Sequence, residues 1–129
     1  MRNNFCNETI LIVDDEEDIR EILGSYFEKN GAKVLTAGNG LEAFEVLQSN
    51  SVNAIISDVC MAEMDGEEFL RQLRQTEFAL VPFFFISGNA HFTSEAVDKF
   101  GARGAFEKPF NFDEIIRALG QALGLTTPA

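Results

Sequence analysis

The first long apolar run of the chain, Thr9-Ile10-Leu11-Ile12-Val13, leads directly into the acidic residues Asp14-Asp15-Glu16. The run lacks the alternation of a half-exposed strand, which is typical of a central parallel strand covered on both faces. Four more short apolar runs are bounded by polar or glycine residues, and they span Lys33–Thr36, Asn53–Ser57, Pro82–Ile86 and Gly104–Glu107. The sequence therefore predicts five strands.

Segments with helical spacing of apolar residues separate the predicted strands. The clearest segment carries Ile19, Ile22, Leu23, Tyr26 and Phe27, followed by the stop signal Asn30-Gly31. Four others follow a plausible N-cap residue, and these residues are Asn39, Asp65, Thr93 and Asn111. Strict alternation of strands and helices predicts an α/β fold: a doubly wound, five-stranded parallel sheet with right-handed crossovers and helices on both faces.

Composition limits the organisation and the partners of the chain. Its 129 residues, 46% of them hydrophobic, suit one compact core, so we expect a single domain over residues 1–129 with its core at about 9–123. No run approaches the roughly 18 apolar residues that span a bilayer, and the start lacks the apolar centre of a signal peptide. We therefore expect a cytoplasmic protein without a membrane partner, in which Cys6 and Cys60 are free thiols. The net charge of -11 disfavours direct binding of nucleic acid.

Chemically active side chains stand at the predicted carboxyl ends of four strands. They are Asp14, Asp15 and Glu16 after the first strand, Asp58 after the third, Ser87 after the fourth and Lys108 after the fifth. Each has an ordinary explanation when taken alone, such as a helix cap, a loop acid or a solvated lysine. Ligands of open parallel sheets bind at this edge, and carboxylates held close together repel one another unless a hard cation lies between them. The convergence therefore predicts a Mg²⁺ or Mn²⁺ site.

A cation beside Asp15 and Asp58, with Lys108 opposite, meets the requirements of phosphoryl transfer. Such a reaction needs an oxygen nucleophile and positive charge near the phosphoryl oxygens. Asp58 is placed to be the nucleophile, and the Ser87 hydroxyl is placed to donate a hydrogen bond to the attached group. The sequence thus predicts that Asp58 accepts a phosphoryl group.

The sequence resembles the receiver domain of bacterial two-component response regulators, including the single-domain chemotaxis and phosphorelay type. The resemblance extends from Thr9 to Leu123 and rests on Val13-Asp14-Asp15-Glu16, Asp58 with Met61, Met64-Asp65-Gly66, Ser87-Gly88 and Lys108-Pro109-Phe110. It implies a flavodoxin-like sheet with strand order 2-1-3-4-5. It also implies that a sensor histidine kinase or a histidine phosphotransfer protein supplies the phosphoryl group to Asp58.

Further site residues follow from the same resemblance. It implies that Mg²⁺ is held by Asp15, Asp58 and the backbone carbonyl of Cys60, with Asp14 in the acidic pocket, and that Lys108 pairs with the phosphoryl group. The Lys108–Pro109 bond is typically cis in this family. No turnover of a separate substrate is expected, so the protein is not interpreted as an enzyme.

The resemblance implies a switch that couples inward movement of Ser87 to burial of Phe106 on the fifth strand. This changes the face formed by the fourth helix, fifth strand and fifth helix, to which a downstream effector protein binds. Three residues depart from the commoner family pattern: Ser87 replaces threonine, Phe106 replaces tyrosine, and Ala62 replaces proline. Without a tyrosine hydroxyl at position 106, any hydrogen bond that it makes in relatives is lost.

Other interpretations stay open on the sequence alone. A Mg²⁺-dependent phosphatase with an aspartate nucleophile needs a second acid two residues later, where this chain has Cys60. A flavodoxin-like cofactor carrier needs a phosphate loop rich in Ser, Thr and Gly, whereas Asp14-Asp15-Glu16 would repel a phosphate. Within the receiver interpretation, the chain is either a stand-alone protein or the N-terminal part of a longer regulator or hybrid kinase.

Overall fold

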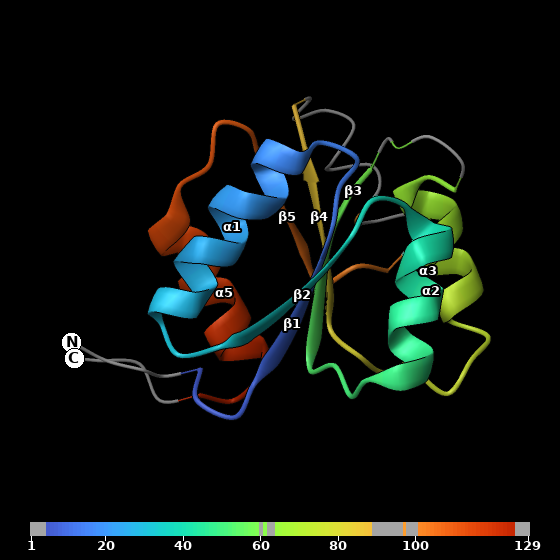
Figure 1. Cartoon of the computed structure of the whole chain (residues 1–129), viewed down its shortest axis with the longest axis horizontal. Coiled ribbons are helices and arrows are strands. Elements are labelled where there is room, and N and C mark those ends of the chain that lie inside the picture. Colours follow the sequence, from blue (N-terminus) through green and yellow to red (C-terminus); the bar gives the residue numbers. More distant parts are fainter. Residues whose placement is uncertain (1–4, 60, 62–63, 89–96, 98–100, 126–129) are drawn as a thin grey trace.

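The computed structural model describes residues 5–59, 61, 64–88, 97 and 101–125. Five parallel strands form one sheet in the order β2-β1-β3-β4-β5 (Figure 1). The strands are β1 (Thr9–Val13), β2 (Lys33–Ala37), β3 (Ala54–Asp58), β4 (Phe83–Ser87) and β5 (Gly104–Glu107). The predicted fold class, strand number and strand order are confirmed.

Two strand boundaries differ from the prediction in a way that matters for the site. Asp58 and Ser87 are the last residues of β3 and β4, and do not follow these strands. The sheet reaches them because Asp58 lies opposite Ile86 and Ser87 lies opposite Glu107 in the pairing register. Both polar residues are therefore held by the rigid backbone of the sheet.

The described helices are α1 (Glu17–Lys29), α2 (Gly40–Ser49), α3 (Gly66–Leu73) and α5 (Phe112–Ala122). Three begin at the predicted N-caps, since the side chains of Asn39, Asp65 and Asn111 each accept a hydrogen bond from the backbone N–H three residues later. The predicted helix with Ala96, Val97 and Phe100 lies outside the described residues, apart from Val97. None of the described helices combines the length and apolar character needed to cross a membrane.

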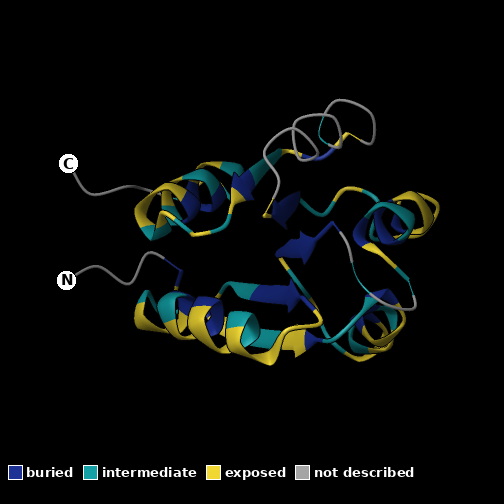
Figure 2. Cartoon of the chain, turned by 90° about the horizontal axis from the view of Figure 1, so that it is seen from above, coloured by how far each residue is buried: buried dark blue, intermediate teal, exposed yellow. Residues whose placement is uncertain are grey.

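The helices cover the two faces of the sheet in pairs. Figure 1 shows α1 and α5 on one face and α2 and α3 on the other. Successive side chains of a strand point to opposite faces, so Ile10 and Ile12 of β1 enter the core beneath α1 and α5, while Leu11 and Val13 enter the core beneath α2 and α3. Figure 2 shows the buried residues on the strands and on the inner sides of the helices.

Phenylalanines fill much of both cores, as expected for a chain with thirteen of them. Phe83 and Phe85 of β4 pack with Phe69 of α3 on one face of the sheet. Phe84 of the same strand packs with Phe106 of β5 on the other face. Each buried phenylalanine contributes about 1.5–3 kcal/mol relative to an exposed one. This packing fixes the strand ends on which the polar residues stand.

Candidate functional site

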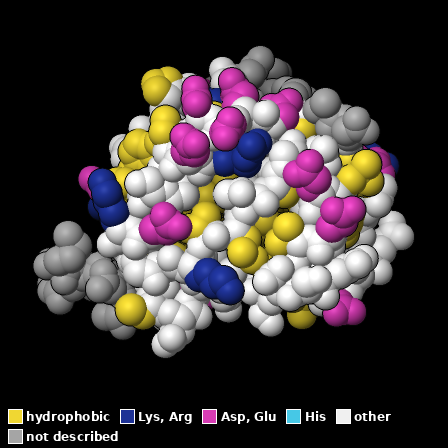
Figure 3. Space-filling model, in the orientation of Figure 1, with side chains coloured by type: hydrophobic (Ala, Val, Ile, Leu, Met, Phe, Trp, Pro, Cys, Tyr) yellow, Lys and Arg dark blue, Asp and Glu magenta, His cyan; other side chains and the backbone are white. Residues whose placement is uncertain are grey.

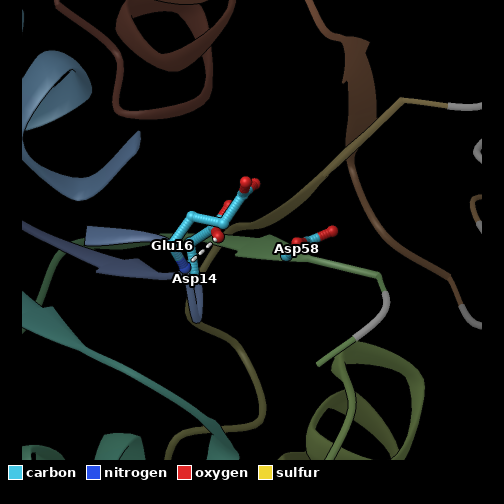
Figure 4. A group of neighbouring side chains, drawn as sticks. All are labelled: Asp14, Glu16 and Asp58. Carbon is cyan, nitrogen blue, oxygen red and sulfur yellow. Dashed lines mark hydrogen bonds between the residues drawn. The ribbon is translucent and has the colours of Figure 1, made fainter. Parts of the chain in front are cut away.

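Three carboxylates meet at the carboxyl end of the sheet. Asp14 follows β1, Asp58 ends β3, and Glu16 stands in the loop that leads to α1 (Figure 4). One carboxylate oxygen from each lies within 4.8 Å of the others. The side chain of Asp14 is 0% exposed and that of Asp58 is 10% exposed, whereas that of Glu16 is 62% exposed. Two buried acids and one exposed acid thus surround a single point.

Lys108 supplies positive charge to this cluster from the end of β5. Its Nζ lies 3.3 Å from Asp14 Oδ2, 3.2 Å from Glu16 Oε1 and 3.5 Å from Asp58 Oδ2. The backbone N–H of Lys108 donates to the carbonyl of Ser87 at 2.9 Å, which ties this residue to the end of β4. The Lys108–Pro109 peptide bond is cis. The structure therefore brings together Asp14, Asp58 and Lys108, as the sequence predicted.

Burial and neighbouring charges change the acid-base behaviour of the cluster. Burial raises the pKa of Asp14, although a hydrogen bond from the Glu16 N–H and the charge of Lys108 act in the opposite direction. Burial of Lys108 acts to lower its pKa, but the charges of Asp58 and Asp14 outweigh this, and the pKa lies above its ordinary value. Lys108 is therefore charged at neutral pH, and one ammonium faces three carboxylates.

The cluster suits a hard divalent cation. Asp14 Oδ2 is buried and accepts no hydrogen bond of normal geometry within the described part of the chain, although Lys108 is within ion-pair distance. Its other oxygen, Oδ1, accepts a hydrogen bond from the Glu16 N–H at 2.8 Å. A buried carboxylate oxygen with further carboxylate oxygens beside it, in an excess of negative charge, is the environment that Mg²⁺ and similar cations prefer. The residues present therefore fit the predicted metal.

Asp14→Asn is expected to raise the free energy of unfolding at pH 7 in metal-free buffer by about 1–3 kcal/mol, because it removes a buried carboxylate charge whose Oδ2 accepts no hydrogen bond of normal geometry from the described residues. A raised pKa means that Asp14 contributes most to stability when protonated, below its unfolded pKa. This contribution is lost as the pH rises through the folded pKa.

Urea unfolding with EDTA at pH 7 and near pH 4 tests this prediction, and the stability advantage of Asp14→Asn over wild type should shrink at the lower pH. An Asp14→Asn protein less stable than wild type at pH 7 would contradict it. Asp18→Asn, at an exposed position of α1, is the matched control.

Ser87 and Phe106 lie on neighbouring strands, offset by one residue in the pairing register, because Ser87 is opposite Glu107. Ser87 is 6% exposed at the end of β4. Phe106 is also 6% exposed, lies opposite Ile86, and stacks on Phe84 with ring centroids 5.7 Å apart. The aromatic ring that the resemblance assigns to the switch is therefore packed in the core beneath α1 and α5.

Two predicted metal ligands do not join the described cluster. Asp15 is exposed and is not one of the three acids that meet, while Cys60 lies outside the described residues. Their assignment as ligands stays a prediction. In the orientation of Figure 1 the strands end at the upper edge of the molecule, and Figure 3 shows acidic side chains gathered there.

Two contacts that the sequence did not predict help to build the site. Glu16, one of the acids expected at this edge of the sheet, reaches Lys108. Gly66, the first residue of α3, lies against the backbone of Asp58: a Cβ atom placed on it would be 2.0 Å from the Asp58 carbonyl oxygen. Its N–H donates to the carbonyl of Val59 at 2.9 Å. The Met64-Asp65-Gly66 motif contained this signal, because a glycine at a helix start permits close approach of another backbone.

Relatives of this chain in sequence are regulators of greater length. The NtrX-like response regulator of Rickettsia bellii is 36% identical over 120 residues, which are 91% of this chain and 25% of that protein. The response regulator SaeR of Staphylococcus aureus is 33% identical over 116 residues, which are 88% of this chain and 50% of that protein. The chain thus spans between a quarter and half of the length of these curated relatives.

Solved structures share the fold and the family. The chemotaxis response regulator CheY4 of Vibrio cholerae matches with a TM-score of 0.81 at 30% identity, covering 90% of this chain and 98% of that one. The response regulator TrrA of Thermotoga maritima, solved in complex with Mg²⁺-BeF, matches with a TM-score of 0.81 at 29% identity, covering 90% and 99%. The family model of the response regulator receiver domain matches residues 10–120. This chain therefore belongs to the receiver domains of two-component response regulators.

Proposed function

We propose that Asp58 accepts a phosphoryl group from a phosphohistidine of a sensor histidine kinase or a histidine phosphotransfer protein. The observation that carries the proposal is the position of Asp58: a largely buried carboxylate whose Oδ2 lies 3.5 Å from the Lys108 ammonium, among further acids. Lys108 is charged at neutral pH and can neutralise oxygens of a phosphoryl group attached there. The Asp58 side chain lies at the sheet edge and is 10% exposed, so part of it remains in contact with solvent.

The proposed transfer to Asp58 forms one bond and breaks one bond at phosphorus. A carboxylate oxygen of Asp58 attacks the phosphorus atom, and a P–O bond forms as the P–N bond of the phosphohistidine breaks. The electron pair of the broken bond stays on the imidazole, which takes up a proton. Loss of the phosphoryl group to water restores the carboxylate and releases inorganic phosphate. The protein therefore stores one phosphoryl group and is not proposed to turn over a separate substrate.

The proposed metal is Mg²⁺, with Mn²⁺ as a substitute. Asp14 and Asp58 offer buried carboxylate oxygens, and the resemblance adds Asp15 and the backbone carbonyl of Cys60. When bound, the cation would offset negative charge on the phosphoryl oxygens. TrrA, which matches this chain over 90% of its length, was solved with Mg²⁺-BeF, and this supports the choice of metal.

We also propose that phosphorylation changes the surface that includes β5 and α5, to which a downstream effector binds. Phe106 supports this proposal because it lies in β5, two residues before Lys108. It also lies opposite Ile86, the residue before Ser87. A charge placed on Asp58 would thus be two strands from the ring. The part of this surface contributed by residues 93–100 lies outside the described residues, apart from Val97.

Incubation with a small phosphodonor and Mg²⁺ is expected to add one phosphoryl group per chain and then stop. EDTA should abolish the labelling, because the acidic cluster then lacks the cation that offsets its charge. Intact-mass spectrometry measures the stoichiometry. Sustained release of phosphate from a generic phosphate ester, at a rate far above the labelling rate, would favour a phosphatase and contradict the proposal.

A further inference from the structure

Glu16 holds an unusual position at the start of α1. It is the N-cap residue, yet its side chain makes no capping hydrogen bond, unlike the shorter polar side chains of Asn39 and Asn111. Its backbone N–H donates to Asp14 Oδ1, which fixes the backbone of the loop. The carboxylate instead extends to Lys108, with Oε1 3.2 Å from Nζ. The Glu16 side chain therefore contacts Lys108 and does not cap the helix.

The donor capacity of Lys108 limits what this ammonium can hold at one time. An ammonium group has three N–H donors, and Lys108 already faces the carboxylates of Asp14, Glu16 and Asp58 at 3.2–3.5 Å. Phosphoryl oxygens attached to Asp58 would be additional acceptors with more negative charge. One existing contact must therefore weaken when the group arrives.

The exposures of the three acids indicate which contact is released. Asp14 is fully buried and Asp58 carries the phosphoryl group, whereas the side chain of Glu16 is 62% exposed. A carboxylate that is already largely hydrated loses little free energy when its ion pair breaks. A carboxylate that stays buried without a partner raises the free energy of the protein by much more. Glu16 is thus the acid that Lys108 leaves most easily.

We propose that Glu16 is a positioning residue that competes with the phosphoryl group for Lys108. This inference rests on the function proposed above. In the unphosphorylated protein, Glu16 forms an ion pair with Lys108 at the solvent side of the cluster. The phosphoryl group must displace it, so Glu16 weakens binding of the group and sets how readily the domain is switched. Removal of its charge strengthens that binding by about two- to fivefold, the effect of one exposed ion pair.

The test uses beryllofluoride with Mg²⁺ as a stable mimic of the phosphoryl group, and ¹⁹F NMR to measure its affinity. Glu16→Gln is expected to bind it about two- to fivefold more tightly than wild type. Glu17→Gln removes the same charge from the next residue, which is exposed in the first turn of α1, and should change the affinity less. Glu16→Asp keeps the charge but is one methylene shorter and suits a helix cap, so it should also bind more tightly.

Measuring the beryllofluoride affinity at high salt distinguishes an electrostatic effect of Glu16 from an effect on the structure of the loop. At about 1 M salt the screening length is near 3 Å, so the advantage of Glu16→Gln should largely vanish, whereas a change in loop structure would persist. The inference is overturned if Glu16→Gln binds no more tightly than wild type, or if Glu17→Gln gains as much. It is also overturned if the gain is unchanged at high salt. If wild type binds no beryllofluoride, or binds it equally after Asp58→Asn, the proposed function itself fails.

Discussion

Gly66→Ala is expected to displace the backbone that carries Asp58 and to slow phosphoryl labelling by at least about tenfold. A Cβ atom on residue 66 would lie 2.0 Å from the Asp58 carbonyl oxygen, 3.0 Å from its carbonyl carbon and 3.1 Å from the Cα of Val59. These are backbone atoms, which cannot rotate away as a flexible side chain can. A shift of about 1 Å in a reacting group can cost about 100-fold in rate, and overpacking of this kind typically costs about 1–3 kcal/mol of stability.

Gly120→Ala is the matched control for this steric effect. Gly120 lies within α5, and a Cβ atom placed on it would meet no described atom within 4 Å apart from those of its chain neighbours and its own helix backbone. The same substitution there should be neutral or stabilise the fold by up to about 1 kcal/mol, because alanine favours a helix. Urea unfolding and the labelling rate should be measured for both variants. Wild-type stability together with wild-type labelling in Gly66→Ala would show that the backbone of Asp58 is not fixed by this contact.

Local sequence patterns predicted most of the fold. The apolar runs located all five strands, and the residues Asn39, Asp65 and Asn111 marked three helix starts, because strand burial and helix capping depend on residues close together in the chain. The ends of β3 and β4 were predicted one residue too early. Polarity suggested that Asp58 and Ser87 lay beyond the strands, but pairing with the neighbouring strands extends the sheet through them.

The candidate site was predicted where topology determines it. Parallel strands place their carboxyl ends at one edge, so the meeting of Asp14, Asp58 and Lys108 followed from the order of the elements. The contact of Glu16 with Lys108 could not be predicted in this way, because the direction of an exposed side chain is not set by periodicity. The approach of Gly66 to Asp58 likewise depends on how α3 packs on β3, which is tertiary structure.

Asp58→Asn is expected to lower Mg²⁺-dependent labelling by more than about 100-fold, since an amide is a poor nucleophile and the variant removes the proposed acceptor. The substitution is nearly isosteric, so the packing at the end of β3 should persist, and circular dichroism can confirm that the variant folds. Asp18→Asn removes one carboxylate from an exposed position of α1 and should label as wild type does.

Intact-mass spectrometry after incubation with a small phosphodonor and Mg²⁺ measures this effect for the three proteins side by side. If Asp58 is the acceptor, wild type and Asp18→Asn gain one phosphoryl group per chain, while Asp58→Asn stays at the background seen with EDTA. Labelling of folded Asp58→Asn to the wild-type extent and at the wild-type rate would contradict the assignment of Asp58.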